Sequence, residues 1–259
     1  MSYAIKVSNL KKSYGANLVI KGIDLEIFSG EVFAFFGVNG AGKTTTLECI
    51  EGLRKYDSGS ISVNGKLGIQ LQSSSLPSHI KTIEAIKLFS KWNKTKIDTS
   101  LLEALNIKDI EKKQYNQMSV GQKRRLHLAL ALISNPDIIF LDEPTAGLDV
   151  EGRFALHQEI RKLKKQGKTI VLASHDMAEV ESLCDRIAIL NEGKIAFCGT
   201  ATELSEKIGK KYFIQVKTIQ GVQTIETDNI ETSLIQMLTE IKSKGQKVLD
   251  IKVDSGTLE

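Results

Sequence analysis

The segment from Gly37 to Thr44 reads GVNGAGKT and has the spacing of a phosphate-binding loop. Glycines in such a loop let successive backbone N–H groups converge on one phosphate. The helix that follows directs its positive dipole end toward the same phosphate. An apolar run, EVFAFF, precedes the loop and a helix-forming run follows it, which is the context that the pattern G-x-x-x-x-G-K-[ST] requires. The segment therefore predicts a nucleoside triphosphate site.

The residue types in this loop suggest separate tasks. Lys43 can reach the β- and γ-phosphate oxygens, the Thr44 hydroxyl can ligate Mg²⁺, and Thr45 is placed for an α-phosphate contact. We expect the loop to bind nucleotide through Gly37, Asn39, Gly40, Ala41, Gly42, Lys43, Thr44 and Thr45.

Two adjacent carboxylates, Asp142 and Glu143, end the apolar run IIFLDEP. Such a run is typical of a buried parallel strand that delivers residues to a site at its C-terminal end. Neighbouring side chains on an extended segment point different ways, so the two acids should not share one role. Asp142 suits the Mg²⁺ shell, directly or through water, and Glu143 suits a general base that polarises the attacking water. Considered alone, the pair also fits a strand end with two solvated acids.

His175 follows a second apolar run, TIVLASHD, and is predicted to lie where it can reach the same γ-phosphate. The segment QMSVGQKRRL poses a different question, because it places a serine, a Gly-Gln pair and three cations at the start of an amphipathic helix. Ser119 has the character of a helix N-cap, and capping and phosphate binding can be one property.

The surrounding pattern predicts an α/β protein. Strand-like runs fill residues 3–36, SGSISVNGK resembles a strand with an Asn-Gly hairpin, and helical periodicity dominates from Pro77 to about Ser134. The order strand, helix, strand across residues 138–174 indicates a parallel sheet with a right-handed crossover. Beyond residue 205 the runs suggest a small β-β-α-β appendage whose helix is opened by Asp228 with Glu231.

The composition narrows the function classes. A formal charge of +4, with lysine and arginine interspersed among acids, gives no reason to expect nucleic acid. Three cysteines, far apart and without metal-ligand spacing, indicate reduced thiols in a cytosolic protein. No window approaches the roughly 18 apolar residues of a membrane span. We do not expect the terminal SGTLE to be the natural end of the protein.

Taken together, these segments resemble the nucleotide-binding subunit of an ATP-binding cassette (ABC) transporter. The phosphate loop, a glutamine loop at GIQLQSSSLP, the signature segment MSVGQ, the acidic IIFLDE, the AGLD loop and the histidine of ASHD occur in the family's order. The resemblance covers about residues 3–204. It implies a P-loop NTPase fold with an N-terminal antiparallel β-subdomain, a parallel-sheet core and a helical subdomain at about 77–135. The runs that follow add a small C-terminal α+β domain over 205–259.

The resemblance also implies roles for further residues. Tyr14 in KSYG would stack on adenine, although an ordinary turn aromatic is the other interpretation. Gln72 would sense Mg²⁺ and link the nucleotide to the helical subdomain and the membrane partner, with Gln70 as a rival. The catalytic set is then Glu143, Lys43, His175 and Gln72, and the Mg²⁺ set is Thr44, Gln72 and Asp142.

The family works as a head-to-tail dimer, in which the signature of one subunit closes over ATP held by the other. Ser119, Gly121 and Gln122 would meet that γ-phosphate, and Asp149 would lie at the dimer seam. Val120 stands where the family signature usually has glycine. Because the contacting serine and the following glycine remain, we interpret Val120 as a tolerated variation that can alter closure geometry or rate.

We therefore expect an Mg-dependent ATPase, peripheral on the cytoplasmic face of the cell membrane, that pairs with a second ATPase subunit and a separate transmembrane permease. LQSSSLPSHIKTIEAIKLF and the extra domain most resemble ATPases of multidrug, antibiotic or lantibiotic export. The alternative is a non-transport cassette ATPase acting on nucleic acid or ribosomes. Those proteins usually carry long coiled coils or two cassettes, and neither feature is present in this sequence.

Overall fold

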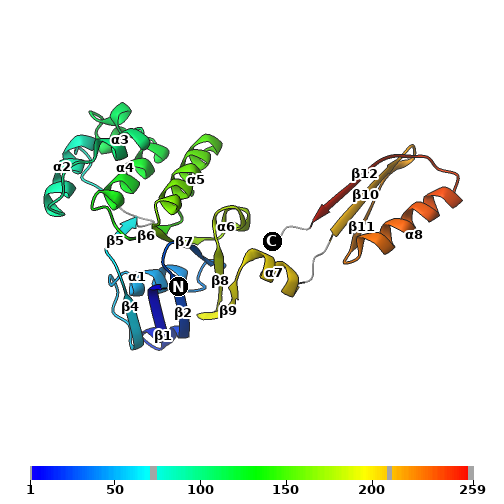
Figure 1. Ribbon diagram of the computed structural model, residues 1–259, viewed down its shortest axis with the longest axis horizontal. Coiled ribbons are helices and arrows are strands. Elements are labelled where there is room, and N and C mark those ends of the chain that lie inside the picture. Colours follow the sequence, from blue (N-terminus) through cyan, green and yellow to red (C-terminus); the bar gives the residue numbers. More distant parts are fainter. Residues whose placement is uncertain (1, 71–74, 209–211, 256–259) are drawn as a thin grey trace. The chain divides into compact units, whose positions relative to one another are not determined.

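The computed structural model describes residues 2–70, 75–208 and 212–255. The chain divides into two compact units, Met1–Gly199 and Thr200–Glu259, and each is described by itself (Figure 1).

An antiparallel sheet opens unit 1 and has the strand order β2-β1-β4. Its strands are β1 (Tyr3–Tyr14), β2 (Asn17–Phe28) and β4 (Ser58–Val63). Alternate apolar side chains of β1 and β2, such as Ile5, Leu10 and Ile23, are fully buried, as a half-covered sheet requires.

A six-stranded sheet forms the centre of unit 1, in the order β5-β6-β7-β3-β8-β9. Its strands are β3 (Val32–Phe36), β5 (Leu67–Gln70), β6 (Ile138–Asp142), β7 (Thr169–Ser174), β8 (Arg186–Asn191) and β9 (Lys194–Gly199). All neighbours pair in parallel except β8 with β9. Every residue of β6 and β7 is buried, which explains why both strands are continuous apolar runs.

The crossover between β6 and β7 brings the chemical motifs to one end of this sheet. β3, β6 and β7 lie side by side, so the phosphate loop, the two carboxylates and His175 all follow C-terminal strand ends at the same edge. The accompanying helices are α1 (Lys43–Ile50), α5 (Val150–Lys165) and α6 (Met177–Leu183). This arrangement confirms the predicted parallel core.

The helical subdomain lies between β5 and β6 in the chain. It contains α2 (Thr82–Trp92), α3 (Thr99–Ala104), two short 3₁₀ helices (Lys108–Ile110 and Tyr115–Gln117) and α4 (Val120–Leu132). Helix α4 buries Leu126, Leu128 and Ala129 and packs against both β5 and α2. The predicted helical insertion is therefore present.

The Asn-Gly hairpin predicted after β4 is wrong. β4 pairs with β1 and β5 pairs with β6, so the chain passes from one sheet to the other at this dipeptide. Two backbone hydrogen bonds explain the change: Asn64 N donates to Ala4 O at 2.8 Å, and Lys66 N donates to the Asp137 carboxylate at 2.9 Å. The turn residues mark a real bend, but distant strands decide which sheet continues.

Unit 2 is a small α+β module that begins with α7 (Ala201–Ile208). Its antiparallel sheet has the order β11-β10-β12, formed by β10 (Tyr212–Thr218), β11 (Gly221–Thr227) and β12 (Val248–Ser255). Helix α8 (Ile230–Ser243) packs against β10 and buries Met237 and Ile241. The N-cap of α8 is Asn229, which accepts from Thr232 N at 3.1 Å; the predicted Asp228 cap is wrong by one residue.

Candidate functional site

The phosphate loop joins β3 to α1 through glycines in conformations that other residues avoid. Gly40 and Gly42 have φ of 85° and 104°, and Gly37 has φ of 154°. A Cβ on Gly37 would lie 2.4 Å from the carbonyl oxygen of Leu190, far inside contact distance. Glycine at position 37 thus lets the loop start against β8, and the open turn leaves its N–H groups available to an anion.

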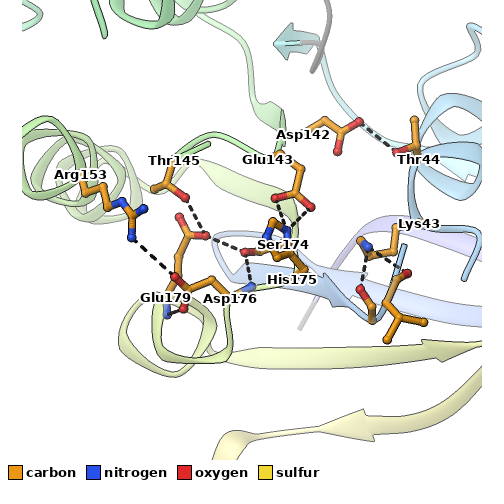
Figure 2. Close-up of polar contacts among 12 residues, drawn as sticks. Lys43, Thr44, Asp142, Glu143, Thr145, Arg153, Ser174, His175, Asp176 and Glu179 are labelled. Atoms are coloured by element: carbon orange, nitrogen blue, oxygen red, sulfur yellow. Dashed lines mark hydrogen bonds and ion pairs between the residues drawn. The ribbon is translucent and has the colours of Figure 1, made fainter. Parts of the chain in front are cut away.

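The ammonium of Lys43 is buried at the first residue of α1. Its Nζ donates to the carbonyl oxygens of Gly37 at 2.6 Å and Val38 at 3.3 Å (Figure 2). Lys43 therefore bridges its own loop and holds a positive charge inside it. Charge-assisted bonds to phosphate are stronger than bonds to neutral carbonyls, so an incoming triphosphate can draw this ammonium onto its own oxygens.

Asp142, the last residue of β6, faces Thr44 across the site. The Thr44 hydroxyl donates to Asp142 Oδ2 at 3.2 Å, and Asp142 Oδ1 is buried without a hydrogen-bond partner in the described parts of the chain. Burial raises the pKa of the Asp142 carboxyl, an effect that the Thr44 hydrogen bond partly offsets.

A divalent cation would relieve the cost of that buried carboxylate. Mg²⁺ is usually held by one or two protein oxygens together with substrate phosphates and water. Over the residues that the structure describes, no cluster of three or more His, Cys, Asp or Glu side chains is arranged for a metal. A hydroxyl beside a carboxylate with one unused oxygen fits a Mg²⁺ ion that arrives with phosphate.

Burial also affects a carboxyl at the far end of α1. It raises the pKa of Glu51 to about 7, and repulsion from Asp142 adds to the shift. A charge on Glu51 is thereby disfavoured beside Asp142, whereas Asp142 itself lies at the Thr44 hydroxyl.

Glu143 turns away from Asp142 because its backbone leaves the extended conformation. Its φ is +48°, in the left-handed region, and its N–H donates to Ala173 O at 3.0 Å. The two carboxylate oxygens lie 2.9 and 2.8 Å from His175 Nδ1 (Figure 2). A carboxylate oxygen accepts a hydrogen bond, so Nδ1 of His175 is the donor in this pair. The structure thus brings the predicted base and the predicted histidine together.

A buried acid that sequence reasoning missed lies behind this pair. Glu179 Oε2 accepts from Ser174 Oγ at 2.7 Å and from Thr145 Oγ1 at 3.2 Å (Figure 2). Ser174 precedes His175, and Thr145 follows Glu143 by two residues, so one carboxylate ties the backbones of both loops. In sequence, Asp176 and Glu179 have the spacing of a helix capping box. That pattern is a sufficient reason for a glutamate at position 179, so the sequence does not suggest that its side chain is buried.

We expect Glu179→Gln to lower ATP turnover about tenfold while leaving nucleotide affinity within about twofold, because hydrogen bonds to a neutral amide oxygen are weaker than the same two bonds to a carboxylate oxygen. Nucleotide titration and steady-state hydrolysis measure the two quantities. Glu181→Gln is the matched control, because Glu181 lies two residues further along α6 and is exposed. Equal effects of the two variants would remove Glu179 from this positioning role.

The signature segment forms the N-terminus of α4. Ser119 Oγ accepts from Gln122 N at 3.3 Å, and Gln122 Oε1 accepts from Ser119 N at 3.2 Å, which is a capping box. Ser119 is nevertheless exposed. Within the described residues no hydrogen bond joins Ser119, Gly121 or Gln122 to the phosphate loop of the same chain.

The signature lies instead beside the AGLD loop. A cavity of about 330 Å³ is lined by Ser119 and Gly121 on one side and by Leu148 and Asp149 on another. Val120 contacts this loop directly, because a Cβ on Gly147 would lie 3.1 Å from Val120 Cγ1. Asp149 caps α5 by accepting from Gly152 N at 2.8 Å. The unusual valine thus lies beside the AGLD loop and remains 55% exposed.

The predicted adenine contact and the predicted glutamine remain to be placed. Tyr14 ends β1 with an exposed ring, and the Arg54 guanidinium lies 5.3 Å from the ring centroid. Gln72 lies outside the described residues, so its predicted role is untested. Its rival Gln70 ends β5, is buried, and has an amide oxygen without a hydrogen-bond partner in the described ranges.

A glycine loop and lysine at a helix N-terminus, with a hydroxyl–carboxylate pair and a second acid beside a histidine, define a P-loop nucleoside-triphosphate hydrolase. Known proteins agree with this class. Residues 20–146 match the family model described as ABC transporter. The chain belongs to the ATP-binding subunits of the ABC transporter family, and it is an ATPase.

The relatives include two bacterial resistance and transport proteins. The linearmycin resistance ATP-binding protein LnrL of Bacillus subtilis (strain 168) is 31% identical over 96% of this chain and 84% of its own length. The lantibiotic transport ATP-binding protein SrtF of Streptococcus pyogenes is 36% identical over 74% of this chain and 88% of its own. The first alignment therefore extends into unit 2.

Solved structures confirm the fold. The ATP-binding subunit of an ABC transporter superposes with a TM-score of 0.72 at 25% identity, over 80% of this chain and 93% of that chain. A bacterial ABC transporter cassette solved as a dimer gives 0.69 at 26% identity, over 76% and 98%.

Proposed function

We propose that the chain binds Mg-ATP at the phosphate loop and hydrolyses it with Glu143 as general base. Lys43 and the loop N–H groups hold the phosphates, while Thr44 and Asp142 hold the cation. Mg²⁺, when bound, neutralises charge on the β- and γ-phosphate oxygens. His175 Nε2 and the Glu143 carboxylate lie at the edge where the γ-phosphate and attacking water would meet. Tyr14 provides the adenine contact.

The ATP site is completed by a second subunit in this proposal. Exposed apolar side chains occur in each motif assigned to the seam: Val38 in the phosphate loop, Val120 in the signature and Val150 after Asp149. Apolar groups that remain exposed beside binding motifs indicate a surface that a partner covers. ABC ATPases dimerise and pair with a permease, and we extend both partners to this chain.

The contact with a permease is assigned to the helical subdomain. A cavity of about 320 Å³ lies between β5 and helices α2 and α4, lined by Gln70, Phe89 and Leu130 among others. On α2, Leu88 is 51% and Trp92 is 77% exposed. An exposed tryptophan beside an apolar groove is the observation that carries this assignment, because tryptophan is enriched where proteins bind one another.

In the described parts of the chain, no helix is both long enough and apolar enough to cross a membrane. We infer that the ATPase acts from the cytoplasmic face on a separate transmembrane permease. The names of the linearmycin resistance and lantibiotic transport relatives support export of a drug, antibiotic or peptide as the cargo class.

Affinity purification from membranes tests this function. The tagged chain is expected to retain a polytopic hydrophobic protein, and Trp92→Ser is expected to reduce its recovery at least about tenfold through loss of one buried aromatic anchor. Lys91→Ser, the neighbouring exposed position on α2, is the matched control. Recovery of nucleic acid or ribosomes in place of a membrane protein would contradict the proposal.

A further inference from the structure

Strand β12 of unit 2 is an edge strand with an uncovered apolar side. It pairs with β10 alone within the described residues. Ile251 lies opposite Val216 and Val253 opposite Ile214, and both β10 partners are fully buried. Directly opposed residues share a face, so Ile251 and Val253 face the side that α8 covers. Even so, they are 40% and 41% exposed.

The position of α8 explains that exposure. Ser233 Oγ of α8 is hydrogen-bonded to Thr227 Oγ1 at the end of β11, at 2.7 Å. Helix α8 therefore lies over β10 and toward the β11 edge of the sheet, and away from the β12 edge (Figure 1). Charged side chains on an edge strand commonly prevent it from pairing with another chain. Strand β12 also carries charged side chains, but their order along the strand permits one kind of pairing.

The sequence Asp250-Ile251-Lys252 is complementary to itself when two copies run antiparallel. With Ile251 opposite its own counterpart, Asp250 of each copy lies opposite Lys252 of the other, twice. Val253 then lies opposite Leu249, which is 55% exposed and stands where β12 shifts register against β10. Opposite charges directly across a strand pair stabilise it and like charges destabilise it, so the charges favour two registers: this one and the one in which Lys252 lies opposite Asp254. The second register places Ile251 opposite Ser255 and loses the apolar contact of Ile251 with its counterpart, so the first is the better of the two.

We propose that β12 pairs with β12 of a second copy of this chain, which joins the two three-stranded sheets into one sheet of six strands. Ile251 and Val253 of both copies then lie together between the two α8 helices. The contact requires no nucleotide and uses no residue of the ATP site, so it goes beyond the proposed function. Because one short strand pair is a small interface, it gains most when the cassettes already hold two copies near each other.

Disulfide trapping of the nucleotide-free full chain tests the register. Cys198 is exposed, so the background is Cys198→Ser. In that background Ile251→Cys is expected to form a covalent dimer on mild oxidation, because its thiols face each other. Val253→Cys is the matched control: its two thiols would lie roughly 13 Å apart at about 3.3 Å per residue, beyond disulfide reach. Absence of the Ile251→Cys dimer, or equal yields from both variants, overturns the proposal.

Charge reversal tests the complementarity in the same assay. Asp250→Lys and Lys252→Asp, each added to Ile251→Cys, are expected to lower the dimer yield roughly tenfold through two like-charged pairs. An equimolar mixture of the two is expected to recover it, since every pair is then opposite. Asp250 lies beside Lys217 in the same sheet, but damage inside one chain would not be repaired by mixing. Failure of the mixture to recover the yield overturns the proposal, as does loss in Asp228→Lys, a charge-reversal control distant in sequence.

The outcome is separable from that of the ATP site. Closure of the cassettes is read from ATP-dependent association of Glu143→Gln, whereas trapping at β12 is read without nucleotide. Unchanged circular dichroism of the variants shows that unit 2 is folded in each case.

Discussion

Glu143→Gln is expected to lower ATP hydrolysis by about 10²-fold or more while ATP affinity stays near that of the unchanged protein. The amide has the same shape and can still bond to His175, so the geometry around β6 is retained. It cannot take a proton from water, which removes the base alone. Single-turnover hydrolysis and nucleotide titration measure the two effects. Turnover near normal would remove Glu143 from this role.

Glu181→Gln is the matched control for that experiment. This glutamate is exposed on α6, so the same chemical change there should leave turnover within about twofold, as for most surface substitutions. In Glu143→Gln, saturating Mg-ATP is also expected to promote dimers, because nucleotide then persists between the subunits. A monomer by light scattering under those conditions would contradict the shared site.

Ser119→Arg is expected to abolish most turnover without weakening ATP binding to a single subunit. The capping box with Gln122 places Ser119 at an exposed helix N-terminus that makes no hydrogen bond to its own phosphate loop in the described structure. A large cation there would obstruct a phosphate presented by a partner. Steady-state hydrolysis and nucleotide titration again separate the two readouts, and lost monomer binding would mean that Ser119 serves its own chain.

Mixing two inactive variants provides the sharper form of this prediction. In a mixed dimer of Ser119→Arg and Glu143→Gln, one site combines the intact base of the first chain with the intact serine of the second. The other site carries both substitutions. Turnover is therefore expected to rise well above that of either variant alone, with Ser119→Arg mixed with itself as the control. No recovery on mixing would contradict a site shared between subunits.

Much of the fold is predictable because its signals are local. Buried parallel strands are continuous apolar runs, and the helical subdomain shows helical periodicity over residues 82–132. The hairpin predicted at Asn64-Gly65 is wrong because it, too, rests on a local signal. A turn motif reports a bend, whereas the choice of β6 as the partner of β5 depends on bonds to residue 137, which is remote in sequence.

The candidate site divides in the same way. The phosphate loop is contiguous, so its spacing alone predicts the glycines, Lys43 and Thr44. Sequence reasoning missed Glu179 because its two donors, Thr145 and Ser174, lie 34 and 5 residues away in the chain. The spacing of Glu179 from Asp176 also fits an ordinary helix cap. The carboxylate matters because it is buried, and burial cannot be predicted from the few residues on either side of it.

The sequence by itself determined which residues can hold a triphosphate, because backbone N–H groups, a lysine and a hydroxyl at fixed spacing need only a strand and a helix on either side. Only the tertiary structure decided which partner each of the two acids faces. The left-handed turn at Glu143 points its carboxylate to His175, while Asp142 remains in the strand and faces Thr44. That division depends on β3, β6 and β7 ending side by side, and hydrogen bonds between strands distant in sequence fix their order.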